Sequence, residues 1–324
     1  MKIVIAGAGS IGCYCGALLA DAGHEVTLLG RSRILDPIRE KGLTVTDFSG
    51  LRRHVAAADL TLTEDAIGLA EADAVIVTVK ARATESLASQ IAQYTPASVP
   101  VLSWQNGMDN ARTLRVALPN NDVRAGMVPF NVVPSQTASF HRATSGEIVI
   151  QSGPGGLGQA LSSPDMPVVE SDDIEAVQWG KLVINLNNAL NALSGLTLKE
   201  QLLDRNWRRL MADQMAEALA VLKAAGHPVA STTPLPAWMT PHILRLPTPI
   251  FTRIAARMLT IDASARTSMA YDLMADRPTE IDRLQGEIIR LGAQSGVPTP
   301  LCARVHALIE QGAKPPLPPD RVAQ

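Results

Sequence analysis

The first half of the chain alternates short apolar runs with residues at helical spacing. In order, the pattern predicts a strand over 2–6, a helix over 10–22, a strand over Glu25–Leu29, a strand over Asp73–Val79, a helix over 82–93 and a strand over Val99–Trp104. Strands and helices that alternate in this way are typical of a doubly wound parallel sheet. Residues 123–171 are richer in strand patterns, with Glu147–Gln151 and Met166–Glu170 as candidates, and we expect them to complete the first domain.

The second half of the chain has a different pattern. From Ile174 onward long helical spacings predominate, which predicts an all-helical domain. The proline-rich stretch Pro228–Pro249 predicts an irregular connection between helices, and the proline-rich tail from about 314 predicts a frayed end. We therefore expect an α/β domain over residues 1–172 and a helical substrate and catalytic domain over 173–324.

The composition agrees with two soluble globular domains. The chain has 324 residues, more than one hydrophobic core usually serves. Its net charge of −2 provides neither a basic surface for nucleic acid nor a polybasic patch for a membrane. No apolar run reaches the roughly 18 residues of a transmembrane helix. We expect a cytoplasmic protein that binds neither nucleic acid nor a membrane.

Three cysteines, Cys13, Cys15 and Cys302, are too few and too irregularly spaced for a disulfide framework or a metal site. Cys13 and Cys15 lie two residues apart on a predicted helix and therefore point to different faces. We expect all three to be ordinary buried thiols of a reducing cytosol, and we expect no bound metal.

The first predicted strand runs directly into a glycine-rich turn. The turn reads Gly7, Ala8, Gly9, Ser10, Ile11, Gly12 and opens the first predicted helix. This strand–turn–helix context is the one in which a GxGxxG motif binds a dinucleotide. The first glycine permits the tight turn, the second lets the backbone approach a pyrophosphate, and the third lets the helix pack on the strand. The helix N-terminus then offers free N–H groups to the phosphates. The first domain is thus predicted to be a Rossmann domain.

The end of the second predicted strand indicates which dinucleotide binds. NAD enzymes place an acid about 20 residues beyond the glycine turn, where it binds the ribose 2′-hydroxyl. Here the strand ends in Gly30, Arg31, Ser32 and Arg33, with no acid. A guanidinium at Arg31 suits a 2′-phosphate, because its planar fork matches phosphate oxygens. The sequence therefore favours NADP(H) over NAD(H).

The helix that opens the second domain combines apolar residues with one lysine and several asparagines. At about 100° per residue, Asn185 lies about 40° from Lys181 and Asn188 about 20° to the other side, so the three share one face. Asparagine is a poor helix-interior residue, so the cluster needs a reason. A polar stripe that lines a substrate site is one reason, and hydrogen bonding of buried amides between helices is another.

Further polar candidates lie at strand ends and in the later helices. Lys80 and Asn106 each follow a predicted central strand, at the edge of the sheet where nucleotide folds bind ligands. In the second domain, Ser268 lies one turn before Asp272 on a predicted helix. Thr279 is expected to be the N-cap of the next helix, with Glu280 in its first turn. Taken singly, each of these features also has an ordinary structural explanation.

Together these segments resemble the ketopantoate reductase (2-dehydropantoate 2-reductase) family. The resemblance extends from the glycine turn to about residue 312. It rests most specifically on Lys181–Asn185, Ser268–Met269, Arg277–Asp282, the turn Gln105–Met108 and the strand Ser145–Ile150. It implies a Rossmann domain followed by a helical domain, with the active site in the cleft, and reduction of 2-dehydropantoate to pantoate in pantothenate biosynthesis.

The resemblance also implies roles for single residues. Lys181 matches the catalytic lysine that donates a proton to the substrate carbonyl oxygen, and Glu280 matches an active-site glutamate that contacts the bound ligands. The remaining matches are binding residues: Asn185 and Ser268 for the substrate, Asn106 for cofactor and substrate, Lys80 near the nicotinamide, and Arg31 at the 2′-phosphate.

Some positions depart from the family pattern. The second helix asparagine usually falls where this chain has Ala189, so Asn188 fills that role only if the helix shifts by one residue or contains a bulge. A later substrate asparagine of some members is Leu198, and Gln285 stands where asparagine is common. Segment 125–133 lacks the family's Thr-rich, His-containing pattern. These departures leave the chemistry intact and leave the substrate open.

Three functions therefore compete. The first is NADPH-dependent reduction of ketopantoate, and the second is a related reduction of another 2-oxo acid or of an imine. The third, a non-catalytic NADP-sensing protein, has no need of the proton donor Lys181. Apolar helices of the second domain would serve a homodimer or the domain's own core equally well.

Overall fold

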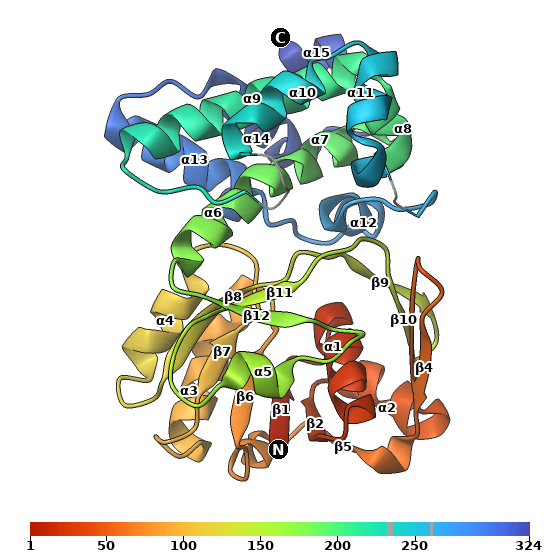
Figure 1. Cartoon of the computed structure of the whole chain (residues 1–324), viewed down its shortest axis with the longest axis vertical. Coiled ribbons are helices and arrows are strands. Elements are labelled where there is room, and N and C mark those ends of the chain that lie inside the picture. Colours follow the sequence, from red (N-terminus) through yellow and green to blue (C-terminus); the bar gives the residue numbers. More distant parts are fainter. Residues whose placement is uncertain (232–235, 260–261) are drawn as a thin grey trace. The chain divides into compact units, whose positions relative to one another are not determined.

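The computed structural model of the chain describes residues 1–231, 236–259 and 262–324. It divides into two compact units, Met1–Ile174 and Glu175–Gln324. All the strands belong to the first unit, and the described part of the second is helical (Figure 1). The expected order of an α/β domain followed by an all-helical domain is confirmed. No helix in the described ranges is both long enough and apolar enough to cross a bilayer.

The first unit is built on a sheet of eight strands. Their spatial order is β12 (Val168–Ser171), β11 (Ile148–Gln151), β8 (Val123–Met127), β7 (Val101–Ser103), β6 (Ala74–Val77), β1 (Lys2–Ala6), β2 (Glu25–Leu29) and β5 (Leu60–Thr63). All neighbouring pairs are parallel except β11 with β8. The predicted parallel sheet is thus confirmed at its centre, and the sheet as a whole is mixed.

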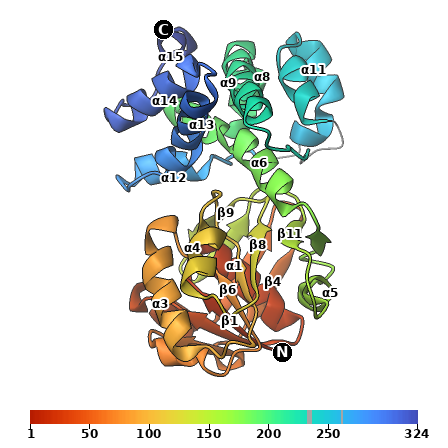
Figure 2. The ribbon, with the colours of Figure 1, turned by 90° about the vertical axis from the view of Figure 1, so that its left-hand side faces the viewer.

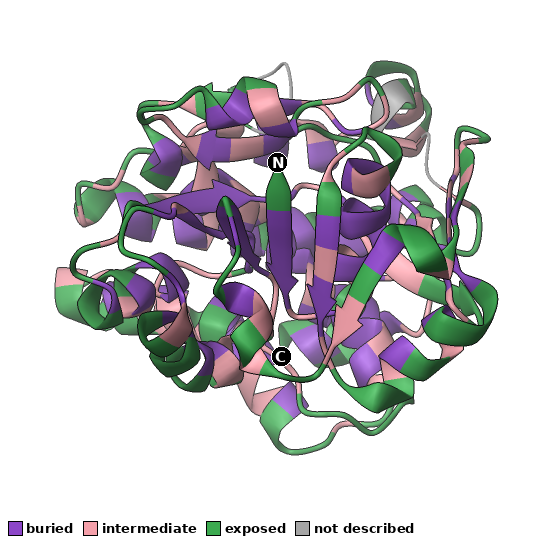
Figure 3. Cartoon of the chain, turned by 90° about the horizontal axis from the view of Figure 1, so that it is seen from below, coloured by how far each residue is buried: buried purple, intermediate pink, exposed green. Residues whose placement is uncertain are grey.

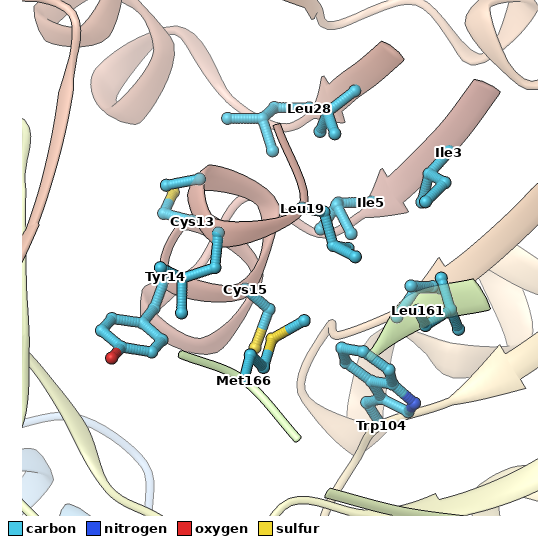
Figure 4. Close-up of a cluster of buried hydrophobic side chains, with 14 of the residues drawn as sticks. Ile3, Ile5, Cys13, Tyr14, Cys15, Leu19, Leu28, Trp104, Leu161 and Met166 are labelled. Carbon is cyan, nitrogen blue, oxygen red and sulfur yellow. The ribbon is translucent and has the colours of Figure 1, made fainter. Parts of the chain in front are cut away.

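Helices cover both faces of this sheet because successive side chains of a strand point to opposite sides. Ile3 and Ile5 of β1 belong to the core that contains α1 (Ser10–Asp21) and α5 (Leu157–Leu161), and Figure 4 shows Ile5 beside Leu19 of α1. Val4 belongs to the opposite core. That core contains α3 (Thr84–Tyr94) and α4 (Asn110–Ala117), which Figure 2 shows across the sheet from α5. β1 is buried except at its first residue (Figure 3).

A second, four-stranded sheet was not predicted. Its order is β4 (Arg52–Val55), β3 (Leu43–Asp47), β10 (Ser139–Arg142) and β9 (Val132–Gln136). The two central strands, β3 and β10, are parallel and lie far apart in the sequence. Segment 125–133 runs from the end of β8 into β9. Helix α2 (Ser32–Lys41), which contains a proline, was also not predicted.

The second unit consists of helices. They are α6 (Ile174–Asn185), which begins one residue before the unit, α7 (Asn187–Ser194), α8 (Leu198–Leu203), α9 (Arg205–Ala224), α10 (Thr240–Leu244), α11 (Thr248–Ile254), α12 (Ser268–Met274), α13 (Ile281–Ser295), α14 (Pro300–Glu310) and α15 (Pro319–Ala323), with short 3₁₀ turns at Ala237–Met239 and Ala256–Leu259. The expectation of an irregular connection over Pro228–Pro249 is wrong for its second part. There Pro241 and Pro249 occupy the first turns of α10 and α11, where a proline's missing N–H costs nothing. Residues 232–235 of this stretch lie outside the described residues.

The expected frayed tail is also wrong. The N–H of Leu317 donates to the carbonyl of Leu193 at 2.9 Å, and Val322 of α15 is fully buried. The β-carbon of Pro316 would lie 3.2 Å from one added at Gly195. Proline removes backbone donors but also restricts the unfolded chain, so a proline-rich segment can dock when apolar contacts are available.

The three cysteines are free and buried, as expected. Burial raises the pKa of Cys13 to about 12 and that of Cys15 still further. Figure 4 shows both within the apolar cluster of the first unit. They are therefore protonated packing residues rather than nucleophiles. The described residues contain no group of three or more His, Cys, Asp or Glu side chains able to hold a metal ion.

Candidate functional site

In the glycine loop between β1 and α1, neighbouring atoms of the protein leave no room for a side chain at two of the three glycines. Gly7 has φ +126°, and a β-carbon there would lie 2.7 Å from the nitrogen of Val79. A β-carbon at Gly12 would lie 2.2 Å from the carbonyl oxygen of Gly7. At Gly9, by contrast, a β-carbon would meet nothing within 4 Å. The fold therefore explains the first and third glycines, and the open space at Gly9 suits a ligand that approaches the backbone.

The helix that follows presents its N-terminus to this open space. Gly9 is the N-cap of α1 and supplies no side chain to the first turn. The first N–H groups of a helix lack partners within the helix and carry its positive dipole end. Gly9 is exposed, and Ser10 and Ile11 are partly exposed. These residues can hold an anionic group such as a pyrophosphate.

Arg31 lies beside the glycine loop because β2 ends against it. A β-carbon at Gly30 would lie 2.4 Å from that of Ala8, and the N–H of Ala8 donates to the carbonyl of Leu29 at 3.0 Å. Arg31 follows as the exposed N-cap of α2. Its guanidinium is thus accessible close to the loop, and this placement suits a phosphate on the adenosine ribose of a dinucleotide.

Lys80 and Asn106 lie at the carboxyl ends of two adjacent parallel strands. Lys80 comes three residues after β6 and Asn106 three residues after β7, and both are exposed. Because β1 also neighbours β6, the glycine loop opens at the same edge of the sheet. The structure therefore gathers the predicted cofactor residues of the first unit along one edge.

Sequence reasoning missed two polar residues at this edge. Thr78 donates its hydroxyl hydrogen to the carbonyl of Gly7 at 2.7 Å, which closes the glycine turn. Gln105 is buried, and its amide donates to the carbonyl of Val79 at 2.8 Å. The signal in the sequence is a polar side chain directly after an apolar strand run, two residues before Lys80 for Thr78 and one residue before Asn106 for Gln105.

In the second unit, Lys181 lies near the end of α6 among buried apolar residues. Leu182 and Val183 are almost fully buried, and Lys181 itself is only partly exposed. Burial lowers the pKa of Lys181 from its ordinary value of 10.5 to about 8. A lysine with this pKa holds a proton at neutral pH and gives it up more readily than an exposed lysine. It is suited to general acid catalysis.

The asparagines after Lys181 divide into two groups. Asn187 and Asn191 are buried and share the amide of Gln201 on α8, with distances of 3.1–3.2 Å. Asn191 also accepts from the N–H of Thr267 at 3.0 Å. For these two, hydrogen bonding between buried helices is the correct explanation. Asn185 is also buried, at 8 % exposed, and its role in substrate binding stays a prediction.

The helix is interrupted between Asn185 and Asn188. α6 ends at Asn185 and α7 begins at Asn187, with Leu186 between them. The amide of Gln285 on α13 donates to the carbonyl of Leu186 at 2.7 Å, and Gln285 is fully buried. Leu186 keeps helical backbone angles, φ −55° and ψ −29°, and its N–H donates to the carbonyl of Leu182 at 3.0 Å, so the interruption lies at its carbonyl, which is bonded to Gln285. An irregularity here is the condition under which Asn188 was expected to take the place of Ala189.

Ser268 is held next to this segment by its neighbour Thr267. The Thr267 hydroxyl donates to the carbonyl of Asn188 at 3.0 Å and accepts from the N–H of Ala270 as the N-cap of α12. Ser268 is exposed in the first turn of α12, and Asp272, one turn on, forms an ion pair with Arg277 at 3.2 Å. The predicted helix with Ser268 and Asp272 one turn apart is confirmed.

The predicted start of α13 was one residue early. Glu280, not Thr279, is the N-cap residue, and the helix begins at Ile281. The side chain of Glu280 forms no capping hydrogen bond. Asp282 occupies the first turn, where an acid complements the helix dipole, so the fold does not need Glu280 for that purpose.

A glycine loop that opens a doubly wound sheet, followed by a helical unit with a partly buried lysine, is typical of a dinucleotide-dependent oxidoreductase. Comparison with known proteins identifies the family. The family model "Ketopantoate reductase PanE/ApbA" matches residues 3–155, and its C-terminal counterpart matches residues 173–313. The chain belongs to the ketopantoate reductase family.

Individual relatives match over nearly the full chain. The 2-dehydropantoate 2-reductase of Halobacterium salinarum is 26% identical over 318 residues, which cover 95% of this chain and 98% of the relative. A solved ketopantoate reductase from Ralstonia eutropha JMP134 is 30% identical with a TM-score of 0.81 and full coverage of both chains. D-mandelate dehydrogenase, solved with NADH and anilino(oxo)acetate, is 22% identical with a TM-score of 0.76 and full coverage of both chains, a likeness of fold. The protein is an oxidoreductase of a family that uses a nicotinamide cofactor.

Proposed function

We propose that this protein uses NADPH to reduce a small 2-oxo acid, and that the substrate is 2-dehydropantoate, which becomes pantoate. The observation that carries the proposal is Lys181, a partly buried lysine whose pKa is lowered to about 8. It lies four residues before Asn185 in the segment that matches the family's C-terminal model. A positive group of this pKa can both stabilise a developing alkoxide and protonate it.

The residues of the first unit fit a bound dinucleotide. Open space at Gly9 and the uncapped start of α1 suit a pyrophosphate, and the exposed Arg31 beside the loop suits a 2′-phosphate. The fold supplies its own reasons for Gly7 and Gly12 but none for Gly9. When bound, the cofactor supplies the hydride that reduces C2 of the substrate.

The chain's own part in the reaction is to bind the substrate and to move one proton. Lys181 donates a proton from Nζ to the substrate carbonyl oxygen as the C2 carbon is reduced, and it regains a proton from solvent afterwards. Asn185, Asn188 and Ser268 hold the polar groups of the 2-oxo acid, while Glu280 contacts the bound ligands. Lys80 and Asn106 bind at the nicotinamide end.

A related reduction of another 2-oxo acid, or of an imine formed from one, is the second candidate. Two positions favour it. Ala189 and Leu198 stand where members of the family have asparagine, and both are buried apolar residues in this protein. Without those amides, a less polar acid than ketopantoate would bind with fewer unpaired groups.

A panel of 2-oxo acids that includes ketopantoate tests the proposal. NADPH oxidation is followed for each compound, and kcat/KM should be highest for ketopantoate. Preference for another 2-oxo acid would support the second candidate. Tight NADPH binding with no turnover of any compound would instead favour an NADP-sensing protein.

A further inference from the structure

A chain of buried hydrogen bonds joins the loop of Lys80 to the loop of Asn106. It begins at Gln105, whose side-chain amide donates to the carbonyl of Val79 at 2.8 Å and to the hydroxyl of Thr84, also at 2.8 Å. The carbonyl oxygen of the same amide accepts from the hydroxyl of Ser103 at 3.0 Å. Both the nitrogen and the oxygen of the Gln105 amide therefore have hydrogen-bond partners.

The network of hydrogen bonds continues through Thr84 to the loop of Asn106. The Thr84 hydroxyl donates to Oδ1 of Asn110 at 3.0 Å, and Nδ2 of Asn110 donates to the carbonyl of Asn106 at 2.6 Å. Thr84 is 2 % exposed and Asn110 is 5 % exposed. Each group accepts from one neighbour and donates to the next. A buried network that is satisfied in this way is rigid and specifies one geometry.

The two ends of this hydrogen-bond network are the reason to assign it a role beyond packing. Val79 directly precedes Lys80, and its nitrogen is also the atom against which Gly7 packs. At the other end the bonded group is the backbone of Asn106 itself. The side chains of Lys80 and Asn106 are exposed, so the buried groups fix the backbone from which each projects.

We propose that Gln105, Thr84 and Asn110 are positioning residues that set the separation of Lys80 and Asn106 against the glycine loop. The inference rests on the proposed function for the roles of Lys80 and Asn106. A displacement of about 1 Å at groups that orient reactants is enough to lower turnover by up to about a hundredfold. The network holds these two loops at a fixed spacing through each catalytic cycle.

Two substitutions of Thr84 separate positioning from packing. Thr84→Val keeps the shape but removes the hydroxyl that links Gln105 to Asn110. Thr84→Ser keeps the hydroxyl and removes one buried methyl group. We expect Thr84→Val to lower kcat/KM for the 2-oxo acid about tenfold, with NADPH affinity changed less than about threefold because Arg31 and the glycine loop remain. Thr84→Ser should retain the activity of the native protein even if it unfolds at a lower temperature. Equal activity of the two variants would overturn the proposal.

A double variant tests whether the effect passes through Asn106. If it does, adding Thr84→Val to Asn106→Ala should cost less activity than Thr84→Val costs in the native protein, and any remaining loss would arise at Lys80, since coupled residues are not additive. Independent, additive losses would contradict the inference.

Amide hydrogen exchange gives a readout that does not depend on turnover. Thr84→Val should raise exchange in residues 78–82 and 105–110 together, and Thr84→Ser should not. Unchanged exchange in both loops of the valine variant would refute the proposed positioning role of the network. If the native protein reduced no 2-oxo acid, the proposed function would fail, but hydrogen exchange would still show whether the network holds the two loops.

Discussion

Replacing Lys181 with methionine should lower activity and raise stability at the same time. Methionine has a similar length and no charge, so it fills the same space without a buried ammonium group. Loss of the proton donor should reduce kcat by roughly a hundredfold or more, the usual scale for general acid catalysis. The fold should gain stability because burial in the native protein opposes the charged form of this side chain.

The magnitude follows from the pKa. The fall from 10.5 to about 8 corresponds to about 3 kcal/mol, since each pH unit in pKa is about 1.4 kcal/mol. Below pH 8 both folded and unfolded chains hold the proton, so the native protein bears this full cost at neutral pH. Between pH 8 and 10.5 the unfolded chain holds more protons, so this group's contribution to stability rises with pH. At pH 7, Lys181→Met should therefore gain up to about 3 kcal/mol, or roughly 5–10 °C in Tm.

Thermal unfolding at several pH values, together with NADPH oxidation, measures both effects. Lys199→Met is the matched control, because Lys199 is an exposed lysine of the same unit. It should change neither quantity appreciably. The Tm difference between the native protein and Lys181→Met should shrink as pH rises above 8. A variant with native turnover would remove Lys181 as the proton donor, and a constant Tm difference across this range would refute the pKa argument.

Three further predictions concern Lys181 and the proposed cofactor residues of the first unit. The rate of reduction should fall about tenfold per pH unit above the pKa of Lys181, near 8, while oxidation of the 2-hydroxy acid should rise through that pH; pH-independent rates in both directions would exclude the lysine. Arg31→Ala should weaken NADPH binding by at least about tenfold and NADH binding far less, measured by fluorescence titration with Arg31→Lys as the control. Equal losses would refute the 2′-phosphate assignment. Gly9→Ala should weaken dinucleotide binding with little change in Tm, because a β-carbon there meets nothing within 4 Å. Gly12→Ala should destabilise the fold by about 1–3 kcal/mol, because its β-carbon would lie 2.2 Å from the Gly7 carbonyl oxygen. Similar unfolding temperatures for the two glycine variants would contradict this contrast.

Features that depend on neighbouring residues could be predicted from the sequence alone. The glycine loop, the alternation of strands and helices, the Lys181 segment and the helix of Ser268 are local patterns. Each depends on the backbone conformation or the periodicity of only a few consecutive residues. The presence of Arg31 and the absence of an acid after β2 are also read directly from the sequence, and the preference for NADP(H) that we infer from them stays a prediction. Its errors at Pro241, Pro249 and the tail came from reading proline as a break where it begins a helix.

Only the tertiary structure shows which polar residues have hydrogen-bond partners within the fold. Periodicity places Asn187 and Asn191 away from the face of Lys181 and Asn185, but it does not reveal their shared partner Gln201, which lies on another helix. The pairing of β3 with β10 joins strands about ninety residues apart. The pKa of Lys181 depends on what surrounds it in three dimensions, and the link from Gln105 to Asn110 passes through Thr84. Burial and hydrogen-bond partners are properties of contacts between distant segments, and a single sequence does not contain them.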